Sequence, residues 1–182
     1  MGMAAPSFYT ADMVRSLPDD GKRYETVHGE LLVTPAPSAR HQHAIRELSG
    51  RLYPYLKQFP VGTLFTSPAD ISWAPDVLVQ PDIFVVTASE ARALEWSRMR
   101  SLLLAIEVLS PATQRYDRFT KRRLYQEYRV GCYWMVSIDE RAAEVWSPDA
   151  TVPRQERERL VWYPAGAAEP LIIPLRDILP PF

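Results

Sequence analysis

Two carboxylates border apolar stretches of the sequence in a way that points to metal chemistry. Asp82 precedes the apolar run 83–86, and Glu107 follows the five apolar residues 102–106. The two acids are 25 residues apart, which suits neighbouring strands joined by a connection. Burial and like charge both disfavour two ionised carboxylates side by side. Since Mg²⁺ or Mn²⁺ would remove that penalty, we expect Asp82 and Glu107 to be metal ligands, with the backbone carbonyl of Val108 as a further one.

A basic segment, 114–129, follows the second acid and supplies cations. Its six basic and two acidic side chains give a local net charge of +4: Arg115, Arg118, Lys121, Arg122, Arg123 and Arg129 against Asp117 and Glu127. An ammonium beside a metal would orient the attacking water and neutralise developing charge, and Lys121 is the candidate for that catalytic role. A helix charged in this way is suited to a phosphate backbone, so Arg115, Arg118 and Arg122 are predicted substrate contacts.

Most of these residues also have an ordinary structural explanation. Asp82 suits a turn cap, and Lys121 suits an ion pair with the acid four residues earlier. The three arginines suit a solvated basic face. His41 and Gln42 open a predicted helix, where they are expected either to line the substrate cleft or to be solvated. Glu107 has fewer such explanations, because buried acids are rare unless they are paired.

The whole chain has an ordinary globular composition. Its 182 residues are 47% hydrophobic and 24% charged, with a formal net charge of −1. Such a chain is expected to fold as one domain, residues 1–182, with a sizeable core. The near-neutral charge argues against strong non-specific affinity for nucleic acid, so an anionic partner must meet a local patch. The single cysteine, the lack of a membrane-length apolar stretch and the lack of an export signal predict a cytoplasmic protein without membrane partners.

Hydrophobic periodicity and turn residues predict a mixed α/β domain with a central sheet. Thr10 and Ser38 are expected helix caps, His28–Gly29 a hairpin turn, and Pro54 a kink or end of its helix. The expected helices are 10–17, 40–59, part of 87–100, 114–129 and a turn at 175–179. The expected strands are 24–27, 30–33, 63–66, 70–73, 80–86, 102–109, 132–138, 143–147, 160–163 and 171–173, with 154–159 as a charged loop.

An ordered set of motifs resembles the Uma-type branch of the restriction-endonuclease-like nucleases, and together they cover about residues 22–150. The matching pieces are Tyr24-Glu25, Gly29-Glu30-Leu31, Pro35, Pro37-Ser38, His41-Gln42, Gln80-Pro81-Asp82, Glu107-Val108-Leu109-Ser110-Pro111, Asp117, Lys121, Tyr125 and Tyr133-Trp134. In the parent signature, Pro-Asp is followed by (Asp/Glu)-x-Lys, and this chain has Leu109 where that lysine is expected. The resemblance implies that Lys121 of the following helix supplies the lysine.

The resemblance also implies a restriction-endonuclease-like core, in which a central mixed β-sheet is flanked by helices, together with Mg²⁺ dependence and a homodimer. Glu30 matches the early acid of the family and is implied to approach the same metal. The leading hypothesis is therefore an endonuclease that hydrolyses DNA with Mg²⁺ or Mn²⁺. The rival is a non-catalytic nucleic-acid-binding or dimeric interaction protein that retains the fold.

Overall fold

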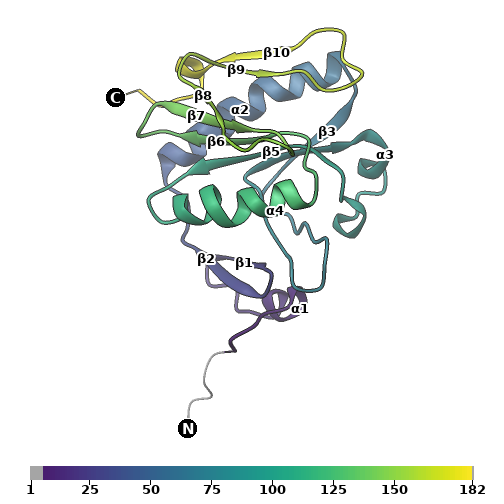
Figure 1. Cartoon of the computed structure of the whole chain (residues 1–182), viewed down its shortest axis with the longest axis vertical. Coiled ribbons are helices and arrows are strands. Elements are labelled where there is room, and N and C mark those ends of the chain that lie inside the picture. The colour runs from purple at the N-terminus through teal and green to yellow at the C-terminus, as the bar shows by residue number, and fades with distance from the viewer. Residues whose placement is uncertain (1–5, 182) are drawn as a thin grey trace.

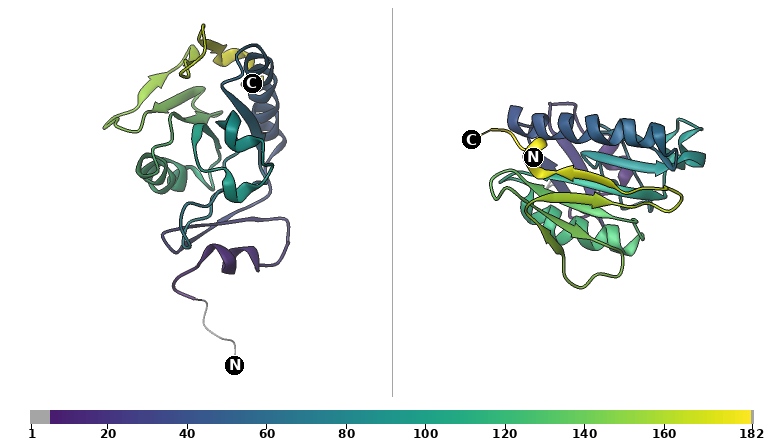
Figure 2. Two further views of the ribbon diagram at one scale, coloured as in Figure 1. Left: turned by 90° about the vertical axis from the view of Figure 1, so that its right-hand side faces the viewer. Right: turned by 90° about the horizontal axis from the view of Figure 1, so that it is seen from above.

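The computed structural model describes residues 6–181, which form a six-stranded sheet with helices on both faces (Figures 1 and 2). The strands of this sheet are β3 (Gly62–Thr66), β4 (Ile83–Thr87), β5 (Leu102–Leu109), β6 (Tyr133–Ser137), β7 (Ala142–Trp146) and β8 (Arg154–Glu156), in that spatial order. The β5–β6 pair is parallel and the other pairs are antiparallel. The predicted mixed sheet is confirmed.

Helices α2 (Ala39–Gln58) and α4 (Arg122–Glu127) cover opposite faces of the sheet. The alternation of β5 divides its side chains between the two faces. Leu104, Ile106 and Val108 belong to the core cluster under α2, which the hairpin of β9 (Arg159–Trp162) and β10 (Leu171–Pro174) completes. Ala105 and Leu109 pack on the other side with residues of α4. Glu107 lies between them in this alternation and therefore faces the α4 side.

The N-terminal helix α1 (Ala11–Arg15) and the hairpin of β1 (Arg23–Val27) and β2 (Glu30–Thr34) lie together at one end of the molecule (Figure 1). The predicted turn is confirmed, because His28 and Gly29 both have positive φ, 49° and 82°. Reciprocal backbone hydrogen bonds of 2.8 Å between Thr26 and Leu78 join the hairpin to the segment before β4. This bridge brings β1 to the edge of the sheet where β4 begins.

The caps predicted from the sequence are also present. Thr10 Oγ1 accepts from the Met13 N–H at 3.2 Å, and Ser38 Oγ accepts from the His41 N–H at 3.2 Å. The remaining short elements are α3 (Ala88–Ala91), a 3₁₀ turn at Trp96–Arg98 and another at Leu175–Asp177. No helix among residues 6–181 has both the length and the apolar character needed to cross a membrane.

Four sequence predictions were wrong in detail. Residues 70–73 make a single bridge, Ile71 to Val79, in place of a strand. Part of the predicted loop 154–159 is β8, which pairs with β7 at the sheet edge in spite of its charged residues. Helix α2 continues through Pro54 to Gln58, so Pro54 does not end the helix, and the alternative of a kink there stays a prediction. The predicted helix 114–129 begins as a π-helical segment, Tyr116–Lys121, before the short α4.

Candidate active site

Asp82 directly precedes β4 and Glu107 lies on the adjacent strand β5, which agrees with their spacing. Ile83 pairs with Ile106 in the β4–β5 register, so the two acids occupy neighbouring positions just beyond that pair. The backbone N–H of Val108 donates to Asp82 Oδ2 at 2.8 Å. Both carboxylates are almost completely buried, with exposed fractions of 2% for Asp82 and 1% for Glu107. Burial of this kind requires charge compensation from neighbouring groups.

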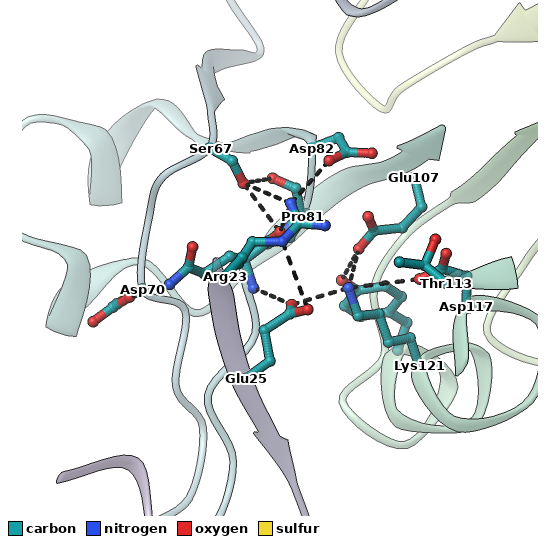
Figure 3. Close-up of polar contacts among 12 residues, drawn as sticks. Arg23, Glu25, Ser67, Asp70, Pro81, Asp82, Glu107, Thr113, Asp117 and Lys121 are labelled. Atoms are coloured by element: carbon teal, nitrogen blue, oxygen red, sulfur yellow. Dashed lines mark hydrogen bonds and ion pairs between the residues drawn. The ribbon is translucent and has the colours of Figure 1, made fainter. Parts of the chain in front are cut away.

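Lys121 provides one compensating charge and joins three buried acids, Glu25, Glu107 and Asp117; we refer to these four residues as the inner cluster (Figure 3). The Nζ atom of Lys121 lies 2.9 Å from Glu25 Oε1, 2.9 Å from Glu107 Oε1 and 3.6 Å from Asp117 Oδ1. Tyr125 also donates its hydroxyl to Glu107 Oε1, at 3.1 Å. The segment after β5 therefore folds back over the strand and brings Lys121 to Glu107, although Leu109 stands at the position of the signature lysine.

The π-helical segment places both charged partners inward. Asp117 and Lys121, four residues apart, are each 2% exposed, whereas Phe119 between them is 57% exposed. π-Helical turns are rare, occur mostly as single turns and are frequent at functional sites. Lys121 thus forms the ion pair with Asp117, four residues earlier, that its ordinary structural explanation predicts. The same ammonium also contacts Glu107.

A second group of polar residues, Arg23, His41 and Asp82, lies beside the inner cluster; we refer to it as the outer cluster. The Nη1 atom of Arg23 donates to Asp82 Oδ1 at 2.9 Å. His41 Nε2 lies 3.1 Å from Asp82 Oδ2. Together with the Val108 N–H, these contacts engage both oxygens of Asp82. The outer cluster therefore unites β1, the first turn of α2 and the start of β4.

Electrostatic environments differ between the acids. Burial raises the pKa of Glu107 well above its ordinary value, because the charge of Lys121 offsets only part of this effect and Asp82 and Asp117 add to it. Burial likewise raises the pKa of Asp117, against the opposing charge of Lys121. Burial would also raise the pKa of Asp82, but the hydrogen bond from His41 and the charge of Arg23 lower it to about 2.

Burial and the neighbouring acids shift the pKa values of the two basic groups in opposite directions. Burial alone would lower the pKa values of Lys121 and Arg23. The charges of Glu107 and Glu25 outweigh burial at Lys121 and raise its pKa. The charges of Glu25 and Asp82 do the same at Arg23. Both cations therefore remain charged at neutral pH.

A cleft of about 830 Å³ opens onto the outer cluster. Arg23, His41 and Asp82 all line it, as does Gln42. The lining comes from α1, the β1–β2 hairpin, the first turns of α2, and residues 66–68, 70 and 110–113. The prediction that His41 and Gln42 line a cleft agrees with this geometry. None of the inner-cluster residues lines it, so Asp82 stands between the cleft and the buried acids.

The structure brings Glu25 to the site in place of Glu30, the acid that the sequence predicted. Glu25 is completely buried, and its Oε1 atom accepts from the Gln80 N–H at 2.6 Å as well as contacting Lys121. Glu30 is exposed beside the hairpin turn, where it pairs with Val27. The motif match included Glu25, as part of Tyr24-Glu25, but gave it no role in the site, and Arg23 was not singled out. Both omissions lie on β1, whose position depends on contacts distant in sequence.

The three predicted substrate arginines lie outside the cleft lining. Arg118 contacts Glu140 at 2.8 Å and Glu144 at 3.2 Å. The Arg122 guanidinium lies over the Trp146 ring, 4.7 Å from its centroid. Arg115 is exposed. Any contact of these arginines with a substrate would therefore be made on the outer surface of the protein and not in the cleft.

The donors of the site fit a hard divalent cation by chemistry, although they are not arranged around one. Within residues 6–181, no three Asp, Glu, His or Cys side chains are placed to hold a metal ion. The four acids of the two clusters exceed Arg23 and Lys121 by two formal charges when all acids are ionised. Glu25 Oε2 is buried without a hydrogen-bond partner. Excess negative charge and an unpaired carboxylate oxygen both suit Mg²⁺ or Mn²⁺.

A mixed sheet with two acids at adjacent strand positions and a lysine packed against one of them defines a nuclease-like fold of the restriction-endonuclease type. The chain belongs to the family described as "Putative restriction endonuclease" (Uma2), whose model matches residues 11–167. This confirms the resemblance derived from the motifs.

A solved structure supports the same fold. The chain is similar to a protein from Anabaena variabilis ATCC 29413, described as a putative nuclease belonging to DUF820 and determined at 1.96 Å resolution. The two share 23% sequence identity, and the similarity covers 93% of this chain and 97% of the other, with a TM-score of 0.76. No curated protein matches the chain.

Proposed function

We propose that the protein is a divalent-metal-dependent endonuclease that hydrolyses DNA phosphodiester bonds. The observation that carries this proposal is the buried contact between Glu107 and Lys121 beside Asp82, which itself lines the cleft. This set combines metal-type carboxylates with an ammonium, although the lysine comes from the segment after the strand. The nuclease-like fold and the family membership support the same reaction class.

In this proposal, Asp82 and Glu107 hold Mg²⁺ or Mn²⁺, with the Val108 carbonyl as a further ligand and Glu25 as the third acid in place of Glu30. The bound ion would lower the pKa of a water molecule and stabilise charge on a phosphoryl oxygen. Lys121 fixes the orientation of Glu107 through their 2.9 Å contact. The longest contact between the Lys121 ammonium and an acid is the one to Asp117, at 3.6 Å. The ammonium N–H on that side is therefore the one most available to orient the attacking water.

The cleft residues have separate roles in this proposal. His41 holds Asp82 Oδ2 and thereby orients the carboxylate at the cleft floor. Gln42 lines the same cleft and offers both a donor and an acceptor to a substrate. The hydroxyl-bearing residues Ser110 and Thr113 line the opposite side. Such neutral donors suit contacts to phosphate oxygens.

The test is incubation of the purified protein with supercoiled plasmid and Mn²⁺. We expect nicked and linear products from the wild-type protein and from Glu30→Gln, the matched control at an exposed acid. Glu107→Gln should reduce cleavage to background, because it removes a ligand charge while retaining the shape of the side chain. Cleavage by Glu107→Gln at the wild-type rate would refute the assignment.

One observation favours the rival function, a non-catalytic nucleic-acid-binding or dimeric module. The inner cluster is sealed from solvent, and no three acids among the described residues are placed to hold a metal ion. Calorimetric titration with Mn²⁺ separates the two functions, since no binding at millimolar metal would favour the rival. Light scattering would test the homodimer that the family resemblance implies.

A further inference from the structure

Arg23 is a charged group of the site in which one nitrogen makes no hydrogen bond. Its Nη1 atom contacts Asp82 Oδ1 at 2.9 Å and the Gln80 carbonyl at 3.0 Å. Its Nε atom is buried without a hydrogen-bond partner and lies 3.8 Å from Glu25 Oε2, which is also buried and unpartnered. That separation is too long for a hydrogen bond. The two atoms therefore form a long ion pair in which neither makes a hydrogen bond, and buried polar atoms without hydrogen bonds are rare and destabilising in folded proteins.

The two cations of the site differ in their freedom to move. Lys121 is 2% exposed at its side chain and contacts three acids of the inner cluster. Arg23 is 18% exposed and lines the cleft, so its guanidinium has open space next to it. Figure 3 shows Arg23 between Asp82 and Glu25, whereas Lys121 lies between Glu25 and the other acids of the inner cluster. Of the two, only Arg23 has room to withdraw from the acids without breaking the core.

We propose that Arg23 is an exchangeable counter-ion: it holds Asp82 beside Glu25 in the metal-free protein and withdraws into the cleft when a divalent cation binds these acids. This inference rests on the proposed metal dependence. It explains why no three acids among the described residues are placed to hold a metal ion. In the metal-free protein, Arg23 is hydrogen-bonded to Asp82 Oδ1 and lies 3.8 Å from Glu25 Oε2. It also assigns Arg23 a second position on the cleft wall, where its charge would face a substrate phosphate.

Removing the guanidinium should therefore strengthen metal binding. A cation that competes for the same oxygens, and repels a second cation within a few ångströms, weakens the apparent affinity for that second cation. Arg23→Gln removes the charge and keeps a polar side chain for the Gln80 carbonyl. Arg15→Gln is the matched control, since Arg15 lines the same cleft but pairs with Asp12 and Asp70 outside the two clusters.

The experiment is calorimetric titration of each protein with Mn²⁺ alone, without nucleic acid. We expect Arg23→Gln to lower the Kd for Mn²⁺ by about tenfold relative to wild type, and Arg15→Gln to change it by less than about twofold. Equal or weaker Mn²⁺ binding by Arg23→Gln would overturn the inference while leaving the proposed function intact. Absence of Mn²⁺ binding by both proteins would overturn both proposals.

A second measurement does not depend on the stability of the glutamine variant. The Arg23 Nε–Hε resonance of the wild-type protein can be assigned by its absence in Arg23→Lys, a variant that retains the charge. We expect this resonance to shift on addition of diamagnetic Mg²⁺, as the guanidinium leaves Glu25 and Asp82. An unchanged resonance in protein that is saturated with Mg²⁺ would contradict the exchange.

Discussion

The inner and outer clusters use the same chemistry, carboxylates beside a basic side chain, but they hold their cations in different ways. In the inner cluster, Lys121 lies among three acids and is closed off from solvent. In the outer cluster, Arg23 faces the cleft and leaves its Nε without a partner. The inner cluster thus resembles part of the core, and the outer cluster resembles a binding surface.

This difference indicates that the two cations contribute differently to stability and to ligand binding. A buried ion pair is strongly destabilising when one member is removed, because the remaining charge is left uncompensated. A partly exposed pair contributes less, because water screens it. Loss of the Lys121 charge should therefore act mainly on folding, whereas loss of the Arg23 charge should act mainly on ligand binding.

The largest effect is expected from Lys121→Met, which removes the cation and leaves three buried acids. We expect a loss of about 3–5 kcal/mol in the free energy of unfolding, measured by urea denaturation at neutral pH. Lys57→Met is the matched control, because Lys57 is exposed on α2; it should change stability by less than about 0.5 kcal/mol. A loss below about 1 kcal/mol for Lys121→Met would show that the ion pairs of Lys121 stabilise the protein no more than ordinary surface ion pairs do.

The next effect concerns pH. The raised pKa values of Glu107 and Asp117 mean that the folded protein binds more protons than the unfolded chain above the ordinary carboxyl pKa. Stability of the metal-free protein should therefore fall as pH rises above the ordinary carboxyl pKa, by up to about 1.4 kcal/mol per pH unit for each proton. Asp82 has the opposite sign, since its contribution is present above about pH 4 and is lost as pH falls toward 2.

Glu107→Gln isolates the part of this slope that Glu107 contributes. The neutral amide retains an oxygen that can accept from Lys121 and Tyr125, but it cannot ionise. We expect a flatter pH profile and a higher stability at pH 8 than for the wild type, measured by urea unfolding in the presence of a chelator. Glu30→Gln, at an exposed acid, should leave the profile unchanged. A profile of Glu107→Gln as steep as that of the wild type would show that another group causes the slope.

Much of the nuclease core could be predicted from the sequence because its determinants are local. The apolar run 102–106 with Glu107 after it predicts a buried strand, and the spacing from Asp82 predicts a neighbouring one; both agree with the structure. Lys121 was proposed as the ammonium of the site from the basic segment 114–129, and the family resemblance added that it replaces the signature lysine. The π-helical turn that delivers it was missed, since a change from i→i+4 to i→i+5 hydrogen bonds leaves little trace in hydrophobic periodicity.

The N-terminal half of the site could not be predicted in the same way. Glu25 and Glu30 belong to the same hairpin, and the pairing register places both on one face of it. Only the docking of the hairpin on residues 78–80 buries Glu25 and leaves Glu30 beside the exposed turn. This contact joins segments more than 50 residues apart in the chain. Local sequence patterns carry no information about it.

A smaller effect is expected where the inner cluster depends on a neutral group. Tyr125→Phe removes the hydroxyl that donates to Glu107 Oε1 but keeps the ring that packs against Tyr133. We expect a loss of about 1 kcal/mol in the free energy of unfolding, because the contact joins a buried hydroxyl to an acid that Lys121 also satisfies. Tyr53→Phe, at an exposed ring, is the control. Equal stability of Tyr125→Phe and the wild type would show that the hydroxyl does not stabilise the inner cluster.

The smallest effect is expected at Arg118, which belongs to neither cluster. Its ion pairs with Glu140 and Glu144 lie on the β7 side of the molecule and are partly exposed. Arg118→Ala should cost less than about 1 kcal/mol of stability. If substrate binds in the cleft, this variant should retain wild-type affinity for a short DNA in fluorescence anisotropy, whereas Gln42→Ala, at the cleft wall, should weaken it. The reverse result would move the substrate from the cleft to the basic outer face, because Arg118 would then have to exchange its two acids for phosphate.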